Sequence, residues 1–212
     1  MADIFVAISE AIQMGDRDKV AKLAEEALKK GTPALDILYK GMVPGIESMG
    51  EKFKSGEFFL PEILICARAM NRGTEVLNPY FPKEGVHKRG TVVIGTIEGD
   101  MHDIGKNLVR MMLECSGFRM VDLGVDVSAD SFAEAAREQK ADIIAISALL
   151  TTTMVNIPKV IEALKRSGIR DNVKVMIGGA PVTRAYADQI GAEGFAEDCT
   201  AAVDEAKRLV AA

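Results

Sequence analysis

The sequence has 212 residues, of which 48% are hydrophobic and 27% are charged, as is usual for a globular protein. Its formal net charge of −5 gives no support for nucleic-acid binding, which needs a basic stripe, so we expect no nucleic-acid partner. The N-terminus lacks the basic segment and cleavage site of a signal peptide, and no apolar run has membrane length. The three cysteines form no CxxC pair and no disulfide framework. These features predict a cytoplasmic protein with reduced thiols and no membrane partner.

The first 80 residues carry helical periodicity alone. Apolar side chains recur every three or four positions in four separate stretches. Gly31 is a C-terminal stop for the second stretch, and Gly41, Pro44 and Gly45 predict a kink in the third. We expect helices over about 4–12, 20–28, 32–54 and 60–78. Four helices with short joints predict an all-α four-helix cap bundle in residues 1–80.

A short segment rich in proline and charge follows the helices. Residues 79–89 read PYFPKEGVHKR and hold two prolines, one glycine and scattered charges. This composition favours an irregular connection over a helix or a strand. We therefore place a linker or hinge at 81–90, between a helical domain at 1–80 and a second domain at 91–212.

From residue 91 onward, short apolar runs alternate with amphipathic helical stretches. Runs of valine and isoleucine are typical of strands buried on both faces, and their alternation with helices predicts right-handed βαβ units. The expected strands are 91–97, 119–124, 142–150, 174–179 and 194–198, and helices should begin near Ile104, Ala129, Thr153, Thr183 and Thr200. We predict an α/β flavodoxin-like (Rossmann-like) domain with a five-stranded parallel sheet in the order 2-1-3-4-5.

Unusual residues follow four of the predicted strands, at 100–105, 124–126, 147–153 and 178–181. Each segment has an ordinary structural explanation: an aspartate or a threonine could cap a helix, and two glycines could form a tight turn. In such a sheet, however, ligands bind beyond the carboxyl ends of the strands, next to the first strand. The occurrence of all four segments at one edge therefore favours a ligand site.

His102, flanked by Asp100 and Asp103, lies in the turn after the first strand. Imidazole is a common metal ligand, and its second ring nitrogen usually donates to a carboxylate, which Asp100 could supply. One histidine cannot hold a bare zinc ion, which takes about four protein ligands in a structural site. The pattern therefore points to a metal that arrives inside a macrocycle, with an axial position left for His102.

Three short motifs follow one another at defined distances. They are D-x-H-x-x-G at 100–105, S-x-L at 147–149 and G-G at 178–179, with 41 residues between the first two and 28 between the last two. This spacing resembles the cobalamin-binding signature of the methionine-synthase and corrinoid-protein family. Residues 54–70, KSGEFFLPEILICARAM, resemble the helical cap of the same family. The resemblance thus covers nearly the whole chain.

The resemblance implies that cobalamin, or a related corrinoid, binds "base-off, His-on". His102 would be the lower axial ligand of cobalt, Asp100 would hydrogen-bond the histidine, and Thr153 would replace the serine that usually completes this relay. Phe59 would belong to a lid over the reactive face, although it could equally belong to the core of the helical bundle. The residues implied around the nucleotide tail are Gly105, Ser147, Leu149, Thr151, Gly178 and Gly179.

The resemblance further implies a methyl carrier, and no nucleophile, base or substrate pocket of its own is visible in the chain. Cobalamin would accept a methyl group from a substrate-specific methyltransferase as methyl-Co(III). A second methyltransferase would pass it to tetrahydrofolate or coenzyme M, and a corrinoid reactivase is a third expected partner. The sequence does not encode the donor, which could be a methylamine, methanol, a methoxylated aromatic compound or a betaine.

Three other functions stay open at this point. A cobalamin-binding sensor or regulatory module would need an output domain, of which the acidic N-terminal half shows no sign. The B12-binding subunit of a mutase would lack the helical cap that the FFLP segment indicates. A flavodoxin-like protein without B12 would not be expected to match all three motif spacings.

Overall fold

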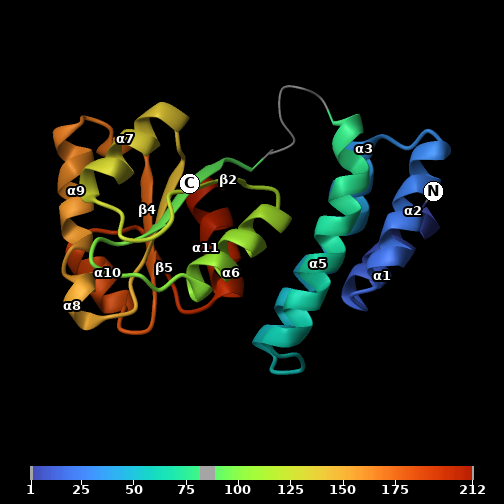
Figure 1. Cartoon of the computed structure of the whole chain (residues 1–212), viewed down its shortest axis with the longest axis horizontal. Helices are drawn as coiled ribbons and strands as arrows, with labels where there is room; N and C mark the ends of the chain where they lie inside the picture. Colours follow the sequence, from blue (N-terminus) through green and yellow to red (C-terminus); the bar gives the residue numbers. More distant parts are fainter. Residues whose placement is uncertain (1, 82–88, 212) are drawn as a thin grey trace. The chain divides into compact units, whose positions relative to one another are not determined.

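The structure is a computed structural model that describes residues 2–81 and 89–211. The chain divides into two compact units, one purely helical and one built around a parallel sheet (Figure 1). The predicted fold class is confirmed, because an all-α cap precedes an α/β domain with a five-stranded parallel sheet. The expected linker at 81–90 falls mainly on residues 82–88, which lie outside the described residues, so the domain boundaries stay a prediction.

Amphipathic stretches account for the helices of the first unit. On α1, for example, Ile8 and Ile12 share one face and are fully buried. Asp16 begins α2 as an N-cap, because its carboxylate accepts a hydrogen bond from the Lys19 N–H at 3.0 Å. The elements are α1 (Ala2–Gln13), α2 (Arg17–Lys29), α3 (Ala34–Asp36), the π-helical η1 (Ile37–Met42), α4 (Val43–Lys54), α5 (Leu60–Leu77) and the 3₁₀ turn η2 (Asn78–Tyr80).

The third predicted helix runs from α3 through η1 to α4 and contains a π-helical segment where a kink was expected. Pro44 has no N–H group, so the preceding turn lacks one hydrogen bond, which suits a wider winding there.

Gly41 and Gly45 in the same stretch allow close packing between helices. A Cβ at Gly45 would lie 2.8 Å from both the Ile12 side chain and the Ser9 carbonyl oxygen. These glycines therefore allow α1 to pack closely against η1 and α4.

The second unit contains one parallel sheet in the predicted order β2-β1-β3-β4-β5. β1 and β3 are buried along nearly their whole length, as central strands with helices on both faces are. Each strand begins within one residue of its expected start and ends one to three residues early, because the chain turns into the loops that carry the unusual residues. The strands are β1 (Thr91–Thr96), β2 (Arg119–Asp122), β3 (Ile143–Ser147), β4 (Lys174–Gly178) and β5 (Gly194–Ala196).

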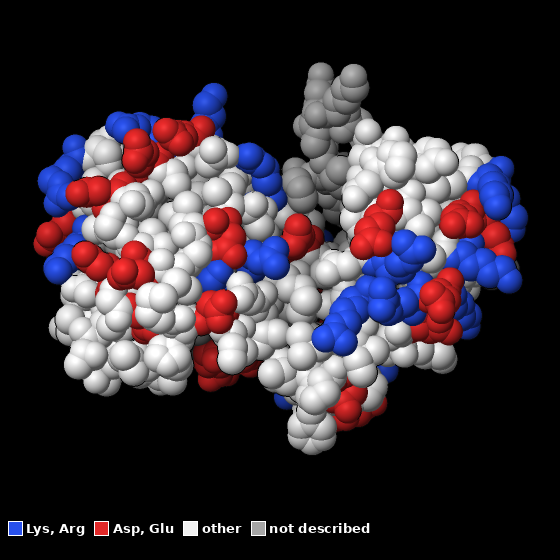
Figure 2. All heavy atoms as spheres, in the orientation of Figure 1, with Lys and Arg blue, Asp and Glu red and all other residues white. Residues whose placement is uncertain are grey.

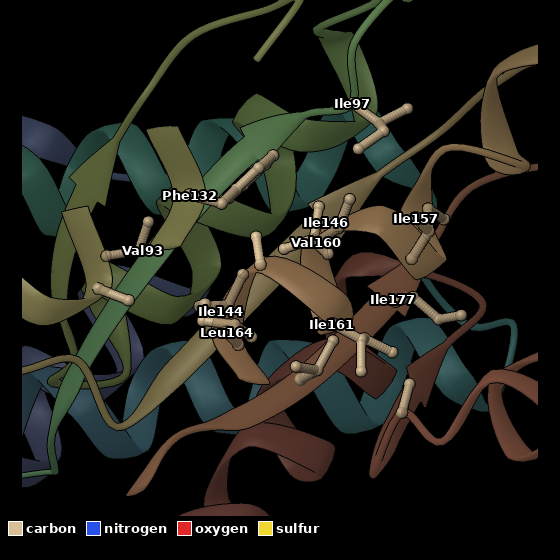
Figure 3. Packing of buried hydrophobic residues seen from close by; sticks show 14 of the residues in the cluster. Val93, Ile97, Phe132, Ile144, Ile146, Ile157, Val160, Ile161, Leu164 and Ile177 are labelled. Carbon is tan, nitrogen blue, oxygen red and sulfur yellow. The ribbon is translucent and has the colours of Figure 1, made fainter. Parts of the chain in front are cut away.

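Helices cover both faces of this sheet, with α7 and α9 on one side and α6 and α11 on the other (Figure 1). An apolar core lies under α7 and α9. Figure 3 shows Val160 and Leu164 of α9 beside Ile146 and Ile144 of β3, and the fully buried Phe132 of α7 joins the same cluster. The helices are α6 (Ile104–Cys115), α7 (Ala129–Gln139), α8 (Thr151–Met154), α9 (Ile157–Arg166), the 3₁₀ turn η3 (Arg170–Asn172), α10 (Arg184–Ile190) and α11 (Cys199–Ala211).

The connection after β3 differs from the prediction. The sequence pattern predicts one helix that begins near Thr153, but the structure has a one-turn helix, α8, followed by the longer α9. Pro158 explains the second start, because proline fits the first turn of a helix but cannot continue one. The consequence is that Thr153 lies inside α8, two residues after its first residue.

Acidic and basic side chains are intermixed on the face of the molecule that Figure 2 shows. Mixed charge of this kind is typical of a solvated surface. Within the described ranges, none of the helices combines the length and the apolar character needed to cross a bilayer.

The three cysteines, Cys66 in α5, Cys115 at the end of α6 and Cys199 at the start of α11, are buried thiols. Burial raises the pKa of Cys66 and of Cys199 to about 11. Both thiols are therefore protonated at neutral pH.

Candidate functional site

The predicted site residues of the α/β unit lie at or near the carboxyl ends of three neighbouring strands. The sheet register pairs Thr96 of β1 with Ser147 of β3, and Ser147 with Gly178 of β4. After β1 the chain passes through residues 98–103, which are neither helix nor strand, before α6 begins at Ile104. We call residues 98–103 the histidine loop. Its main chain and side chains contact the segments that follow β2 and β3.

Asp100 anchors the histidine loop. Its side chain is fully buried, and each carboxylate oxygen has two partners. Oδ1 accepts a hydrogen bond from the main-chain N–H of His102 at 3.0 Å and lies 2.7 Å from Nδ1 of the His102 ring. Oδ2 accepts from the Leu149 N–H at 2.7 Å and from the Thr153 hydroxyl at 2.9 Å. Asp100 thus ties the histidine loop to the segment after β3 and does not cap α6.

The charge of Asp100 determines the tautomer of His102. Burial alone would raise the pKa of Asp100, but the hydrogen bonds from Leu149, His102 and Thr153 outweigh it and hold the pKa well below its usual range. An ionised carboxylate only accepts hydrogen bonds, so Nδ1 of His102 must carry the proton between them. In the neutral ring the lone pair is then on Nε2, which is the nitrogen available to a metal.

Thr153 completes a chain of hydrogen bonds, Thr153–Asp100–His102. Its hydroxyl has a second acceptor, the Leu150 carbonyl oxygen, at 3.0 Å. Its methyl carbon would lie 3.5 Å from a Cβ placed at Gly99, so it packs against the histidine loop. The alternative explanation of Thr153 as a helix cap is wrong, because neither α8 nor α9 begins with a side-chain cap.

The surroundings of His102 are open and apolar. The His102 side chain is 53% exposed, and its neighbours Met101 and Ile104 are 69% and 77% exposed. Leu149 and Leu150, which belong to the segment that holds Asp100, are each 41% exposed. Exposed apolar side chains beside an accessible imidazole suit a broad, largely apolar ligand with a metal at its centre.

The glycines of the predicted tail slot have different surroundings. At Gly179, where φ is +125°, a Cβ would collide with the Ala148 carbonyl group. At Gly178 a Cβ would lie 2.8 Å from the Ala196 carbonyl oxygen. Both glycines are therefore required by the packing of the sheet edge itself. Gly105 differs, since a Cβ there would meet no atom within 4 Å, and it borders open space.

Phe59 lies just before α5 in the helical unit and is 67% exposed. The alternative that Phe59 belongs to the core of the helical bundle is therefore wrong. Its N–H donates to the Glu62 carboxylate at 3.0 Å, which fixes the start of α5. Thr151 is exposed at the first residue of α8, and Ser147 is the half-buried last residue of β3.

Several partners of the histidine loop were not recognised from sequence. The Thr96 hydroxyl donates to the His102 carbonyl oxygen at 2.8 Å, and Oδ1 of Asp126 accepts from the Gly99 N–H at 2.7 Å. Thr96 is a normal strand residue by its pattern. Asp126 was noted among the strand-end residues but without a role. The usable signal was a hydroxyl at the carboxyl end of β1, directly before the histidine loop.

An ion pair between a buried lysine and a more exposed aspartate fixes the start of α6. Lys106 is 3% exposed and donates to both carboxylate oxygens of Asp122 at 2.6 and 2.7 Å. Although burial acts in the opposite direction, the Lys106 hydrogen bond and charge lower the pKa of Asp122, with help from the Gly124 N–H. The pair connects the helix that follows the histidine loop to the end of β2.

The family follows from comparison with known proteins. Residues 90–206 and residues 4–78 each match a family described as a B12 binding domain. Trimethylamine corrinoid protein 1 of Methanosarcina acetivorans is 47% identical over 210 residues, which are 98% of this chain and 97% of that protein. The chain belongs to the B12-binding corrinoid proteins. This corrinoid protein is also 45% identical to the dimethylamine corrinoid protein of Methanosarcina barkeri over 206 residues, 96% of each chain.

A solved structure has a similar fold over nearly the whole chain. The methanol:cobalamin methyltransferase complex of Methanosarcina barkeri matches this corrinoid protein with a TM-score of 0.86 and 30% sequence identity. The match covers 99% of this chain and 80% of that chain. It therefore includes both the helical unit and the α/β unit.

The site residues of this corrinoid protein fit a corrinoid. A corrin ring would bring the equatorial ligands of its cobalt, so a single side-chain donor would be enough to complete the site, and Nε2 of His102 is free of the contact with Asp100 that Nδ1 makes. The described residues contain no cluster of three or more His, Cys, Asp or Glu side chains that could hold a metal ion by themselves. The exposed apolar side chains and the space at Gly105 suit a bulky, mostly apolar cofactor.

Proposed function

We propose that this corrinoid protein is a methyl carrier in a methyltransferase system, with His102 as the axial ligand of cobalt. The Thr153–Asp100–His102 chain carries the proposal, because it holds the imidazole by Nδ1 and leaves Nε2 available. When bound, the corrinoid supplies a cobalt ion that accepts and releases a methyl group. The protein supplies binding, orientation and shielding.

His102 and Asp100 control the axial position in this proposal. The Asp100 carboxylate keeps the ring in the Nδ1–H tautomer, so that Nε2 offers its lone pair. Asp100 itself stays ionised, because hydrogen bonds from Leu149, His102 and Thr153 hold its pKa well below the usual range. Thr153 keeps the carboxylate in place by donating its hydroxyl proton to Oδ2 of Asp100.

We assign the nucleotide tail of the cofactor to the carboxyl ends of β1, β3 and β4. The residues assigned to it are Gly105, Ser147, Leu149, Thr151, Gly178 and Gly179. The register between Ser147 and Gly178 supports a shared role, as does the open space at Gly105. The packing of the sheet edge alone requires both glycines of the G-G pair, so Gly105 is the more informative position for a test.

The helical unit is proposed to shield the reactive face of the corrin. Phe59 supports this role because it is 67% exposed and thus available to cover a ligand. An apolar lid excludes water from a reactive centre. The proposed hinge at 81–90 would let this lid move when a partner enzyme approaches cobalt.

The proposed donor is a methylamine. The relatives at 47% and 45% identity are named trimethylamine and dimethylamine corrinoid proteins, whereas the methanol complex is 30% identical. The proposed partners are a substrate-specific methyltransferase, a second methyltransferase that serves tetrahydrofolate or coenzyme M, and a corrinoid reactivase. The solved methanol:cobalamin methyltransferase complex supports the first of these partners by analogy.

An absorption spectrum of the loaded protein tests the axial ligand. Purified protein is incubated with hydroxocobalamin under reducing conditions, free cofactor is removed, and wild type is compared with His102→Ala. His87→Ala is the matched control, because the sequence has two histidines. We expect wild type and the control to share one axial-ligand band, and His102→Ala to lose it.

Each outcome decides a different part of the proposal. If His102→Ala has the same spectrum as wild type, His102 is not the cobalt ligand, although the B12 domain stands. If wild type retains no cofactor, the methyl-carrier proposal fails as a whole.

A second experiment tests the methyl donor. Loaded protein is mixed with trimethylamine or with methanol, each with the corresponding methyltransferase. Methylation by methanol alone would contradict the methylamine assignment.

A further inference from the structure

The main chain of the histidine loop is held by two side chains that lie outside the three sequence motifs. Thr96 is the last residue of β1 and is fully buried. Its hydroxyl donates to the main-chain carbonyl oxygen of His102 at 2.8 Å. A buried hydroxyl needs a partner, and His102 provides it. The buried Thr96 side chain thereby holds the peptide group between His102 and Asp103 in place.

Asp126 holds the other end of the same turn. Its Oδ1 accepts a hydrogen bond from the Gly99 N–H at 2.7 Å, and its own N–H donates to the Asp100 carbonyl oxygen at 3.0 Å. These two bonds join the segment after β2 to the first half of the histidine loop. On the other side, Oδ2 of Asp100 accepts hydrogen bonds from the Leu149 N–H and the Thr153 hydroxyl. The loop is thus held from both neighbouring segments.

The backbone of Asp126 supports a specific role for this contact. Its φ is +54°, in the left-handed region that few non-glycine residues adopt, and aspartate and asparagine tolerate it better than other side chains. Such a conformation persists only where its surroundings fix it, and it occurs often at functional sites. Here the conformation places both the Asp126 carboxylate and its N–H against the histidine loop.

We propose that Thr96 and Asp126 are positioning residues for His102. They fix the main chain of residues 99–102, so that the imidazole, already oriented by Asp100, is presented in one place. The inference rests on the proposed function, in which Nε2 of His102 coordinates cobalt. It predicts that loss of either contact leaves the protein folded but lets the His102 ring sample other positions and weakens corrinoid binding.

The full chain offers matched variants at both positions. Thr96→Val keeps the shape of the buried side chain and removes the hydroxyl, whereas Thr96→Ser keeps the donor. Asp126→Ala removes the acceptor, whereas Asp126→Asn keeps an acceptor oxygen and the tolerance for positive φ. Two independent pairs keep the test decisive if one variant fails to fold.

The first measurement uses the protein without cofactor. With ¹⁵N-labelled histidine in a His87→Gln background, His102 gives the only ring signals, and their chemical shifts report the tautomer. We expect one Nδ1–H tautomer in wild type, Thr96→Ser and Asp126→Asn. In Thr96→Val and Asp126→Ala we expect averaged shifts, because the ring no longer stays on Asp100.

The second measurement is a titration with hydroxocobalamin, followed by the axial-ligand band in the absorption spectrum. We expect Thr96→Val and Asp126→Ala to bind about fivefold to tenfold more weakly, as for the loss of one hydrogen bond, with a reduced axial-ligand band. Thr96→Ser and Asp126→Asn should stay within about twofold of wild type, since both restore the hydrogen bond.

Two results would overturn the inference. One is that Thr96→Val and Asp126→Ala match wild type in both ring shifts and affinity. The other is that the Ser and Asn variants are impaired as much as the Val and Ala variants, which would indicate a general packing effect. If wild type itself binds no hydroxocobalamin, the proposed function fails instead, while the ring shifts of the cofactor-free protein still decide whether Thr96 and Asp126 position His102.

Discussion

At the scale of single residues, Thr153 holds the buried Asp100 carboxylate through its side-chain hydroxyl. Its hydroxyl proton has two acceptors, Oδ2 of Asp100 at 2.9 Å and the Leu150 carbonyl oxygen at 3.0 Å. The extra methyl group restricts the side-chain rotamer and packs toward Gly99. Thr153 thus holds the buried carboxylate with a hydroxyl whose direction is limited by its own methyl group.

This arrangement predicts different effects for two substitutions at Thr153. Thr153→Val removes a hydrogen bond to a charged group, and we expect the free energy of unfolding to fall by about 1.5–3 kcal/mol. Thr153→Ser removes only the methyl group, and we expect a loss of about 0.8 kcal/mol or less. Urea unfolding of the cofactor-free protein measures both values. Equal losses for the two variants would show that the hydroxyl does not hold Asp100.

At the scale of secondary-structure elements, the close approach of the ends of β3 and β4 depends on Gly179. Gly179→Ala would force a Cβ into the Ala148 carbonyl group at a φ of +125°, so we expect a loss of stability of about 2 kcal/mol or more. Gly105→Ala is the control, because it lies in α6 with no atom within 4 Å of its Cβ. We expect it to fold normally and to bind hydroxocobalamin more weakly.

Thermal unfolding and a cofactor titration distinguish these two glycines. A Gly105→Ala variant with normal affinity for hydroxocobalamin would remove Gly105 from the proposed cofactor slot. A Gly179→Ala variant of unchanged stability would contradict the packing explanation for Gly179.

The junction of α10, β5 and α11 depends on Glu205. Hydrogen bonds from Arg208, and then from Arg184 and the Phe195 N–H, lower the pKa of Glu205 from 4.5 to about 2 against the effect of burial. Because the folded pKa is the lower one, the stabilisation is complete above about pH 4.5 and is lost as pH falls toward 2. We therefore expect the stability of Glu205→Gln to depend less steeply on pH between these values than that of wild type.

Urea unfolding at several pH values between 6 and 2 provides this measurement. Glu134→Gln, on the exposed face of α7, is a control for the loss of one carboxylate. Parallel pH profiles for wild type and Glu205→Gln would show that Glu205 does not gain its stabilisation from the charged form.

The sheet could be predicted because β1, β3 and β4 are largely apolar runs. The helices that begin at Ile104 and Ala129 could be predicted from their amphipathic spacing. The short α8 could not, since its position depends on Pro158 and on contacts with Asp100 that are distant in sequence. The three motifs located Asp100, His102 and the strand ends. They did not reveal Thr96 or Asp126, because threonine is ordinary in a strand and aspartate is ordinary in a turn.

At the scale of the whole molecule, the proposed function requires the helical unit to act on chemistry that takes place in the α/β unit. Phe59 is the residue through which this can be tested. Because it is 67% exposed, Phe59→Ala should change the free energy of unfolding by no more than about 0.5 kcal/mol. If Phe59 is part of a lid, the reduced, cobalamin-loaded Phe59→Ala variant should oxidise in air several times faster than loaded wild type.

Stopped-flow absorption of the reduced protein after mixing with oxygenated buffer gives this rate. Val6→Ala, which changes another exposed apolar residue of the helical unit, is the matched control. An oxidation rate that is the same in Phe59→Ala, Val6→Ala and wild type would remove Phe59 from the proposed lid.

The buried cysteines have a consequence for the proposed methyl carrier. A transferable methyl group is an electrophile, and a thiolate is among the best nucleophiles that a side chain offers at neutral pH. With a pKa of about 11, Cys66 and Cys199 are each thiolate in only about one molecule in ten thousand at pH 7. Burial also keeps all three sulfur atoms away from solvent. In the proposed function, burial and the low thiolate fraction thus keep these side chains from taking the methyl group that is meant for a partner enzyme.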